Sequence, residues 1–354
     1  MSWENNVRRV VPYVAGEQPK ISDVIKLNTN ENPYPPAPSV QNILDNFNIS
    51  KMKLYPDPNA EVLINAIAEN YQVKPEQVFV GVGSDDVISM AFLTFFNSQR
   101  PVLFPDVTYS FYDVWADVYK IPYQQIKLTE DFRINPDDYK IPNGGIIFPN
   151  PNAPTGVLES VDLIEEILQV NPDSVVMIDE AYIDFGGESC LPLLKKYENL
   201  LVIQTYSKSR SMAGMRIGFA IGNEKLIRYL NDVKFSINSY TMNHLTLLCG
   251  AESLKDDNYF RSCTSKIIET REDTKQKLAE LGFIFPDSKS NFIFASHPDY
   301  DASIIFEKLK ARKIFVRYWN KPRINQYMRI TIGTPEEMNC LLTALQEIMG
   351  ELNR

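Results

Sequence analysis

The sequence predicts an α/β protein with a mostly parallel central sheet in a large domain, and a smaller α+β domain after it. Three observations support this. The chain has 354 residues, which exceeds one compact core of ordinary size. Short apolar runs alternate with amphipathic stretches from Gln77 to about residue 245. Beyond that point one long helical stretch replaces the alternation. We expect an N-terminal arm (1–40) packed with the small domain, a large domain (41–245) and a small C-terminal domain (246–354).

Residues 1–60 are rich in proline and asparagine, as in the stretch from Asn30 to Pro36. This composition favours extended, irregular chain over helix, because proline lacks the N–H that a helix needs and restricts the residue before it. Long irregular segments in compact proteins usually have a role. The segment is therefore predicted to lie as an arm over another surface.

The large domain begins with the alternating pattern of short apolar runs and helical stretches. Six strands are predicted, at Val78–Val82, Pro101–Phe104, Ile146–Pro149, Val175–Ile178, Leu201–Thr205 and Ile217–Ile221. Helices are predicted from Gly83 to about Phe96, over Val161–Val170 and over Glu224–Val233. Strands that alternate with helices form mostly parallel sheets covered on both faces. Ligands of such sheets lie beyond the carboxyl ends of the strands, so chemically active residues should follow the apolar runs.

The C-terminal part has a different order of elements. After the helical stretch come strands at Phe292–Ala295, Ile314–Arg317 and Met328–Ile332, a helix over Ala302–Arg312 and a terminal helix from Pro335. We interpret this as the smaller α+β domain, which the N-terminal segment joins.

Composition narrows the classes of function. The net charge is −9 and no dense Lys/Arg run appears, which argues against a nucleic-acid partner. No apolar segment resembles a secretory signal or reaches the length of a membrane span, so we expect a cytoplasmic protein with no membrane partner. The sequence has two histidines and four widely spaced cysteines without a C-x-x-C pair, a poor set of ligands for a structural zinc site, and no metal site is predicted.

Polar residues follow several of the predicted strands. Gly83, Ser84 and Asp85 follow the first strand and open a helix, where unpaired N–H groups can bind an anion, although Ser and Asp also serve as plain helix caps. Asp179 follows the fourth strand and Lys208 the fifth. Each alone has an ordinary structural explanation.

Taken together, these three predicted sites indicate a specific cofactor. Pyridoxal phosphate needs a lysine amine for its Schiff base, a carboxylate at its pyridine nitrogen and a cradle for its phosphate. Lys208 and Asp179 supply the first two, and the Gly83–Asp85 turn with Arg216 supplies the third, since a guanidinium fork suits phosphate.

The motifs around these residues resemble the aspartate-aminotransferase superfamily, and within it the histidinol-phosphate aminotransferases, nearly end to end. Ser207-Lys208 followed by Ala213-Gly214-Met215-Arg216-Ile217-Gly218 resembles the Schiff-base signature, and Asp179-Glu180-Ala181-Tyr182 resembles the strand-end motif. The resemblance implies the fold of pyridoxal-phosphate-dependent transferases, with Lys208, Asp179 and Tyr182 as catalytic residues.

The resemblance also implies further cofactor contacts. Tyr182 would bond the ring hydroxyl and Tyr109 would stack on the pyridine, while Ser84, Asp85, Ser207 and Arg216 would form the phosphate cup. Tyr55, in Leu54-Tyr55-Pro56-Asp57, would reach the cofactor phosphate of a neighbouring subunit, which implies a homodimer with shared active sites.

The sequence departs from the family pattern in one turn. In Asn150-Pro151-Asn152-Ala153-Pro154-Thr155-Gly156, Ala153 stands where the family commonly has an asparagine that bonds the ring hydroxyl. Either Asn152 takes over that contact, or Tyr182 makes it alone.

Two arginines are predicted to hold the anionic tail of the substrate. Arg317 and Arg329 follow or lie within apolar runs, where a guanidinium is costly to bury unless it meets an anion or an internal salt bridge. By resemblance they grip a substrate phosphate, with Tyr13 of the arm closing over it and Asn30 nearby. The expected activity is ping-pong transfer of an amino group between glutamate/2-oxoglutarate and histidinol phosphate/imidazole-acetol phosphate in histidine biosynthesis.

Three other functions remain open from the sequence. They are a broad or aromatic aminotransferase, a threonine-phosphate decarboxylase of the same fold, and a non-catalytic cofactor-binding module of a regulator. The last would need an attached DNA-binding unit, and the sequence has no helix-turn-helix pattern or basic N-terminal unit to supply it.

Overall fold

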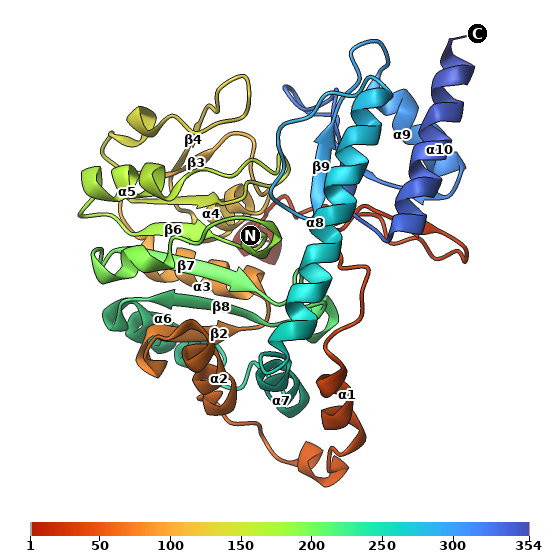
Figure 1. Cartoon of the computed structure of the whole chain (residues 1–354). Helices are drawn as coiled ribbons and strands as arrows, with labels where there is room; N and C mark the ends of the chain where they lie inside the picture. The colour runs from red at the N-terminus through yellow and green to blue at the C-terminus, as the bar shows by residue number, and fades with distance from the viewer. Residues whose placement is uncertain (1, 354) are drawn as a thin grey trace.

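A seven-stranded sheet forms the centre of the larger part of the molecule (Figure 1). The computed structural model describes residues 2–353. The strands lie in the order β2-β8-β7-β6-β5-β3-β4. Only β8 runs antiparallel to its neighbours, β2 and β7, so the predicted mostly parallel sheet is confirmed. The bounds are β2 (Val78–Gly81), β3 (Val102–Pro105), β4 (Tyr123–Ile126), β5 (Gly145–Pro149), β6 (Val176–Asp179), β7 (Leu200–Thr205) and β8 (Gly218–Gly222).

Helices cover both faces of this sheet. Alternate side chains of a strand point to opposite faces. Ile147 of β5 therefore packs with α3 (Ser84–Phe95), α4 (Tyr112–Tyr119) and α6 (Glu224–Ile237). Its neighbour Ile146 packs on the other face with α5 (Val161–Val170). Six strands of this sheet are buried along their whole length and are mostly apolar, which is why the sequence predicted them.

One strand had no such signal. Three of the four residues of β4 are exposed, because it lies at the edge of the sheet. Its sequence, Tyr-Gln-Gln-Ile, has no apolar run, and the sequence analysis did not predict it.

The first 60 residues are less irregular than predicted. They contain the helix α1 (Pro38–Asp45), which begins with a proline in its first turn, where the missing N–H has no helical partner to lose. α1 packs with α7 (His244–Ser253), and α2 (Glu61–Tyr71) packs with both α7 and β2. Short 3-10 helices occur at Trp3–Asn6, Ile49–Lys53, Pro75–Gln77, Pro136–Tyr139, Ile183–Phe185, Leu191–Lys195 and Ala213–Met215.

The long helix α8 (Asp257–Glu280) runs along the molecule to a second, smaller unit (Figure 1). Its sheet has the order β11-β12-β9 and is antiparallel, with α9 (Ala302–Ala311) and α10 (Pro335–Leu352) packed into one apolar core. The strands are β9 (Phe292–Ala295), β11 (Arg317–Tyr318) and β12 (Met328–Thr331).

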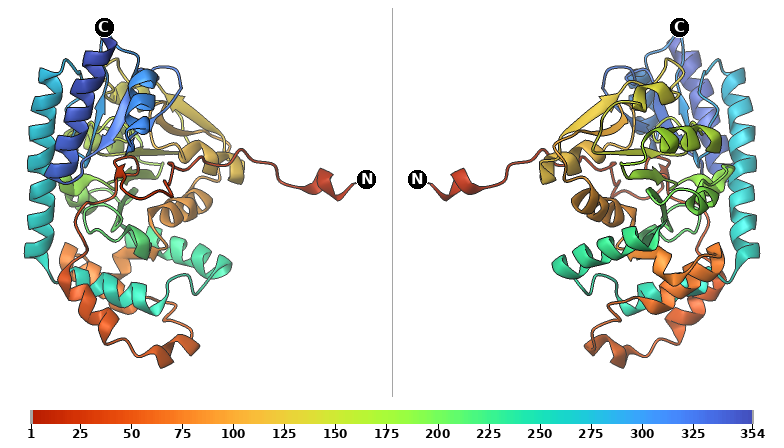
Figure 2. Two further views of the ribbon diagram at one scale, coloured as in Figure 1. Left: turned by 90° about the vertical axis from the view of Figure 1, so that its right-hand side faces the viewer. Right: turned by 90° about the vertical axis from the view of Figure 1, so that its left-hand side faces the viewer.

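The predicted strand at Ile314–Arg317 is divided in the structure. Its first half is β10 (Ile314–Phe315), which pairs in parallel with β1 (Ile25–Lys26) of the N-terminal segment. Its second half, β11, pairs with β12, and the buried side chain of Val316 separates the two. The short 3-10 helix at Trp3–Asn6 extends away from the body of the molecule (Figure 2), whereas Tyr13 and Gly16 lie against it. The domain limits at residues 40 and 245 remain a prediction.

Within residues 2–353, no helix is both long enough and apolar enough to cross a membrane. The same residues contain no group of three histidine, cysteine or carboxylate side chains placed to bind a metal ion.

Candidate active site

Two cavities lie side by side where the carboxyl ends of the central strands face the smaller unit. We call them the aspartate cavity and the arginine cavity. The aspartate cavity has a volume of about 180 Å³ and contains Asp179, Ser84 and Arg216 on its walls. The arginine cavity has a volume of about 130 Å³ and contains Arg317 and Arg329. Both are lined by Thr29, Tyr109, Ala153, Tyr182 and Lys208.

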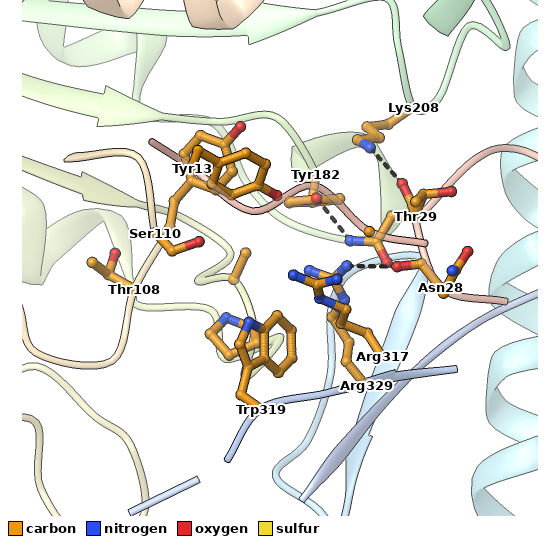
Figure 3. A pocket seen from close by; sticks show the side chains of 15 residues that line it. Tyr13, Asn28, Thr29, Thr108, Ser110, Tyr182, Lys208, Arg317, Trp319 and Arg329 are labelled. Atoms are coloured by element: carbon orange, nitrogen blue, oxygen red, sulfur yellow. Dashed lines mark hydrogen bonds between the residues drawn. The ribbon is translucent and has the colours of Figure 1, made fainter. Parts of the chain in front are cut away.

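Lys208 lies at the boundary of the two cavities, in the loop that follows β7. Its Nζ donates a hydrogen bond of 3.1 Å to the carbonyl oxygen of Thr29 (Figure 3). Burial, and next the positive charge of Arg329, lower the pKa of the Lys208 amine from 10.5 to about 8. The neutral amine, which is the nucleophilic form, is therefore far more populated near neutral pH than for an ordinary lysine, at about a tenth of the total at pH 7.

Asp179 ends β6 and is 4% exposed. It accepts hydrogen bonds of 3.1 Å from Tyr112 Oη and 3.1 Å from the Ala181 N–H. Burial raises the pKa of its carboxyl from 3.8 to about 6. No lysine or arginine among residues 2–353 forms an ion pair with it. A buried carboxylate without a cation is costly, so this position suits a protonated ring nitrogen.

The turn before α3 forms a tight cradle at the other side of the aspartate cavity. Gly83 has φ +87°, and a Cβ there would lie 2.4 Å from Nη2 of Arg216. A Cβ at Gly218 would lie 2.2 Å from the backbone of Gly83. Only glycine at both positions lets the guanidinium and the first turn of α3 approach each other. The first N–H groups of a helix have no partner within it, so the cradle suits a phosphate.

The carboxylate of Asp85 does not bind the anion but positions two neighbouring side chains. It accepts a hydrogen bond of 2.8 Å from Tyr109 Oη and lies 3.4 Å from Arg216 Nη2. Only the backbone N–H of Asp85 is therefore free to bind an anion. Tyr109 packs edge-on against Tyr112, which fixes the plane of its ring.

Most residues predicted as cofactor contacts meet in the aspartate cavity. Its walls include, from the prediction, Ser84, Asp85, Tyr109, Asp179, Tyr182, Ser207, Lys208 and Arg216. Gly83 lies directly behind Arg216. Their roles toward the cofactor stay predictions.

Asn152 does not line either cavity. Its amide donates to the carbonyl of Val107 at 3.0 Å and to Thr155 Oγ1 at 2.9 Å, so both of its N–H groups are used. Ala153 takes the cavity position instead. This geometry gives Asn152 no donor with which to bond a ring hydroxyl.

Tyr55 is also absent from both cavities in a single chain. Its side chain is 79% exposed and packs only loosely against the Tyr240 ring, at 4.6 Å between ring centroids. Exposure is what a residue that serves a neighbouring subunit would show.

Arg317 and Arg329 lie opposite each other across the β11–β12 pair (Figure 3). Like charges directly opposite across strands are destabilising unless something neutralises them. Both guanidinium groups lie 5.2 Å from the Trp319 ring, and Nε of Arg329 is buried without a hydrogen-bond acceptor. Burial lowers the pKa of Arg329, and the charge of Arg317 lowers it further. The pair thus forms a strong anion site.

The remaining predicted substrate contacts divide into two kinds. Tyr13 lines the arginine cavity and stacks on Phe111 at 4.1 Å. Arg317 donates to the carbonyls of Val14 and Ala15, which ties the arm to the cavity. Asn30 also lines the cavity, but it is 1% exposed and donates to Tyr182 Oη at 2.9 Å.

Sequence reasoning missed several lining residues, namely Gly16, Asn28, Thr29, Thr108, Ser110 and Trp319. Trp319 could have been found, because it lies two residues after Arg317 and so faces the same side of an extended chain. Thr108 and Ser110 flank Tyr109. Thr29 contributes its backbone carbonyl, which carries no sequence signal.

Comparison with known proteins identifies the family. The family described as aminotransferase class I and II matches residues 22–345. This chain belongs to that family. The aminotransferase is 53% identical over 349 residues to a protein named histidinol-phosphate aminotransferase from Lactococcus lactis subsp. cremoris (strain SK11), covering 99% of this chain and 98% of the relative. A relative of the same name from Clostridium botulinum (strain Kyoto / Type A2) is 51% identical over 350 residues and equally well covered, at 99% of both chains.

A solved structure agrees with the fold of the aminotransferase. The histidinol-phosphate aminotransferase of Sinorhizobium meliloti, in complex with pyridoxal-5'-phosphate, matches with a TM-score of 0.85 at 22% identity, over 93% of this chain and 91% of that one. The predicted transferase fold is confirmed. Aminotransferases of this family depend on pyridoxal phosphate, so the predicted cofactor is confirmed as well. The chemistry of the aspartate cavity fits this cofactor: an unpaired buried carboxylate, a lysine amine and a glycine-lined anion cradle.

Proposed function

We propose that this aminotransferase is a histidinol-phosphate transaminase, which moves an amino group between glutamate and imidazole-acetol phosphate in histidine biosynthesis. Relatives that carry this name match the chain at 51–53% identity over its whole length. The observation in the site that carries the proposal is the facing pair Arg317 and Arg329, with Tyr13 of the arm beside them. Two guanidinium forks exceed what one carboxylate needs and suit the charge of a phosphate monoester.

The residues of the aspartate cavity would hold the cofactor. Asp179 would pair with its ring nitrogen, Tyr109 would cover its face, and Arg216 with the first turn of α3 would bind its phosphate. When bound, pyridoxal phosphate supplies an electron sink for the charge that develops at the substrate α-carbon.

Lys208 Nζ would take a proton from the substrate α-carbon and deliver it to the carbon on the other side of the amino nitrogen, which is a 1,3-proton shift. A general base works best when its pKa lies near the working pH. The lowered pKa of Lys208, about 8, meets that condition. Its position on the wall between the two cavities lets it reach both reaction partners without moving its backbone.

Both substrates would use the same arginines in turn. Glutamate offers a carboxylate and histidinol phosphate a phosphate, and both are planar or forked oxygen acceptors. Trp319 stacks against both guanidinium groups and holds them in place while one anion leaves and the next enters.

We further propose a homodimer with shared active sites. The surface around Tyr55 exposes several large apolar side chains: Ile49, Met52, Leu54, Phe235, Ile237 and Tyr240. Exposed apolar side chains gathered in this way are typical of an interface. In the proposed dimer, Tyr55 of a second chain reaches this cofactor cradle, a role that its 79% exposure in one chain leaves open.

We also propose a cytoplasmic location. Within residues 2–353 all four cysteines are free thiols, three of them buried. Free thiols are typical of a reducing compartment.

A half-reaction screen tests the substrate. The holoenzyme is mixed separately with histidinol phosphate, glutamate, phenylalanine and threonine phosphate, and the visible absorbance of the lysine-linked cofactor is followed. Histidinol phosphate and glutamate should each remove this absorbance, because each transfers its amino group to the cofactor. Release of carbon dioxide from threonine phosphate, or faster conversion of phenylalanine than of histidinol phosphate, would refute the assignment.

The role of Lys208 needs its own test. Lys208→Ala should lose the visible absorbance of the bound cofactor and nearly all turnover, with circular dichroism unchanged. An unaltered spectrum in this variant would place the covalent link elsewhere.

A further inference from the structure

Asn30 was predicted to contact the substrate, yet the structure uses its polar atoms internally. Its backbone N–H donates 3.0 Å to Thr331 Oγ1, and its Oδ1 accepts 3.0 Å from the same hydroxyl. Its carbonyl accepts 3.0 Å from the Asn291 amide. Asn30 also has φ +56°, a left-handed conformation that asparagine tolerates better than most residues. These bonds hold Asn30 against Thr331 at the end of β12 and against Asn291, the residue before β9.

The remaining group, Nδ2, points at Tyr182. It donates 2.9 Å to the phenolic oxygen. The Thr331 hydroxyl donates to Oδ1 of Asn30, which fixes the orientation of the amide. The side of the amide that faces Tyr182 therefore carries only N–H donors. A hydroxyl that accepts a hydrogen bond at its oxygen must aim its own proton elsewhere. The Tyr182 side chain is buried and lines both cavities, so that proton is directed into them.

A second observation makes this direction important. Ala153 lines both cavities but has no polar atom, and the amide of Asn152 is spent on Val107 and Thr155. In the described residues, neither member of this turn can donate to a hydroxyl group on a ring held over Asp179. Tyr182 is then the donor available on this side.

We propose that Asn30 is a positioning residue that forces Tyr182 to donate its proton to the ring oxygen of the cofactor, and thereby replaces the donor that Ala153 lacks. This inference rests on the proposed role of Tyr182. Asn30 acts through Tyr182 and touches neither reacting atom. The effect is electrostatic, because a fixed donor stabilises negative charge on the ring oxygen.

The test follows the bound cofactor, not turnover. Asn30→Gly keeps the left-handed backbone and removes the amide. The dissociation constant of pyridoxal phosphate should rise about tenfold, the value of one hydrogen bond to a charged group. The pH midpoint of the cofactor's visible absorbance should move upward, because the deprotonated form loses its donor. Asn30→Asp, which keeps the shape and loses the donor, should act in the same direction and serves if the glycine variant fails to fold.

Three comparisons separate positioning from general damage. Asn291→Ala removes another buried bond to Asn30 but leaves its amide, so it should leave the midpoint in place. In a Tyr182→Phe background, Asn30→Gly should add nothing. In an Ala153→Asn background, which restores an amide donor, the effect of Asn30→Gly should shrink. A midpoint that responds equally to Asn291→Ala, or that shifts further in the Tyr182→Phe background, would overturn the proposal.

Failure of this inference is distinguishable from failure of the proposed function. If the wild type never takes up the cofactor on Lys208, the function itself is wrong. If the wild type does take up the cofactor on Lys208, and Asn30→Gly leaves both the affinity and the pH midpoint unchanged, only the role proposed for Asn30 is wrong.

Discussion

Among single residues, Lys208 destabilises the folded chain, because its charged amine is buried. An ammonium group is buried beside Arg329, and within residues 2–353 its only direct hydrogen bond is to a backbone carbonyl. The folded chain therefore holds that proton less tightly than the unfolded chain does. Between pH of about 8 and 10.5 the unfolded state binds more protons at this site, so stability contributed by the site rises with pH.

The first prediction follows from that sign. In the cofactor-free protein, Lys208→Met should raise the melting temperature at pH 7, because it removes a buried charge. The gap to the wild type should close as the pH rises from about 8 past 10.5, where the lysine is neutral in both states. Scanning calorimetry across this range measures it. A gap that is constant with pH would mean that the amine is not desolvated.

Asp179 is a buried group of the opposite charge, a carboxylate with no cation paired to it among residues 2–353. Burial raises its pKa to about 6, so acidification protonates it and removes the charge that a ring nitrogen would meet. The second prediction is that pyridoxal phosphate binds more weakly to the wild type below pH of about 6 than above it. Asp179→Asn should bind weakly at every pH and lose this part of the pH dependence. Fluorescence titration measures the dissociation constant of pyridoxal phosphate at several pH values. If the dissociation constants of the wild type and Asp179→Asn change with pH in the same way, Asp179 is not the group responsible.

Among the elements, the first turn of α3 depends on two glycines that let it meet Arg216. The third prediction is that Gly83→Ala weakens binding of the cofactor by about tenfold or more, since the new Cβ collides with the guanidinium and φ +87° strains any other residue. Gly214→Ala is the matched control, because no atom lies within 4 Å of its new Cβ. Equilibrium dialysis should leave the control unchanged. Equal loss in both variants would argue against the cradle.

The β11–β12 pair sets the fourth prediction. Arg317→Gln should raise the KM for histidinol phosphate about tenfold or more, the value of a charge-assisted hydrogen bond, with a smaller change in kcat. Arg312→Gln, at the end of α9 with its ion pairs to Glu347 and Glu351 on the surface, is the control. Steady-state kinetics with histidinol phosphate as the varied substrate and saturating 2-oxoglutarate as the amino acceptor distinguishes the two variants. An unchanged KM would move the phosphate away from this pair.

At the scale of the whole molecule, the proposed dimer gives the fifth prediction. Lys208→Ala and Tyr55→Ala should each be impaired alone. Mixed dimers of the two should recover activity, because one of their two sites would combine an intact Lys208 with an intact Tyr55 from the partner. Denaturing and refolding the mixture, then assaying it against each variant alone, measures the recovery. No recovery, or a monomer in sedimentation, would contradict shared sites.

The sequence predicted the framework of this molecule far better than its fine contacts. Buried strands such as β6 and β7 are continuous apolar runs, so their position and the residues that follow them, Asp179 and Lys208, were readable. The edge strand β4 and the division at Val316 were not, because exposure and a change of partner leave no periodic pattern. Contacts through backbone carbonyls, such as that of Thr29, depend on tertiary geometry and are invisible in a sequence.

The segment around Asn30 has a consequence for folding. Ile25 pairs with Ile314 and Asn30 bonds Thr331, so these partners lie about 300 positions apart in the sequence. Bringing together residues this distant carries a large loop-closure cost, which slows folding. The arginine cavity takes walls from both segments, so we expect it to form only after they have met.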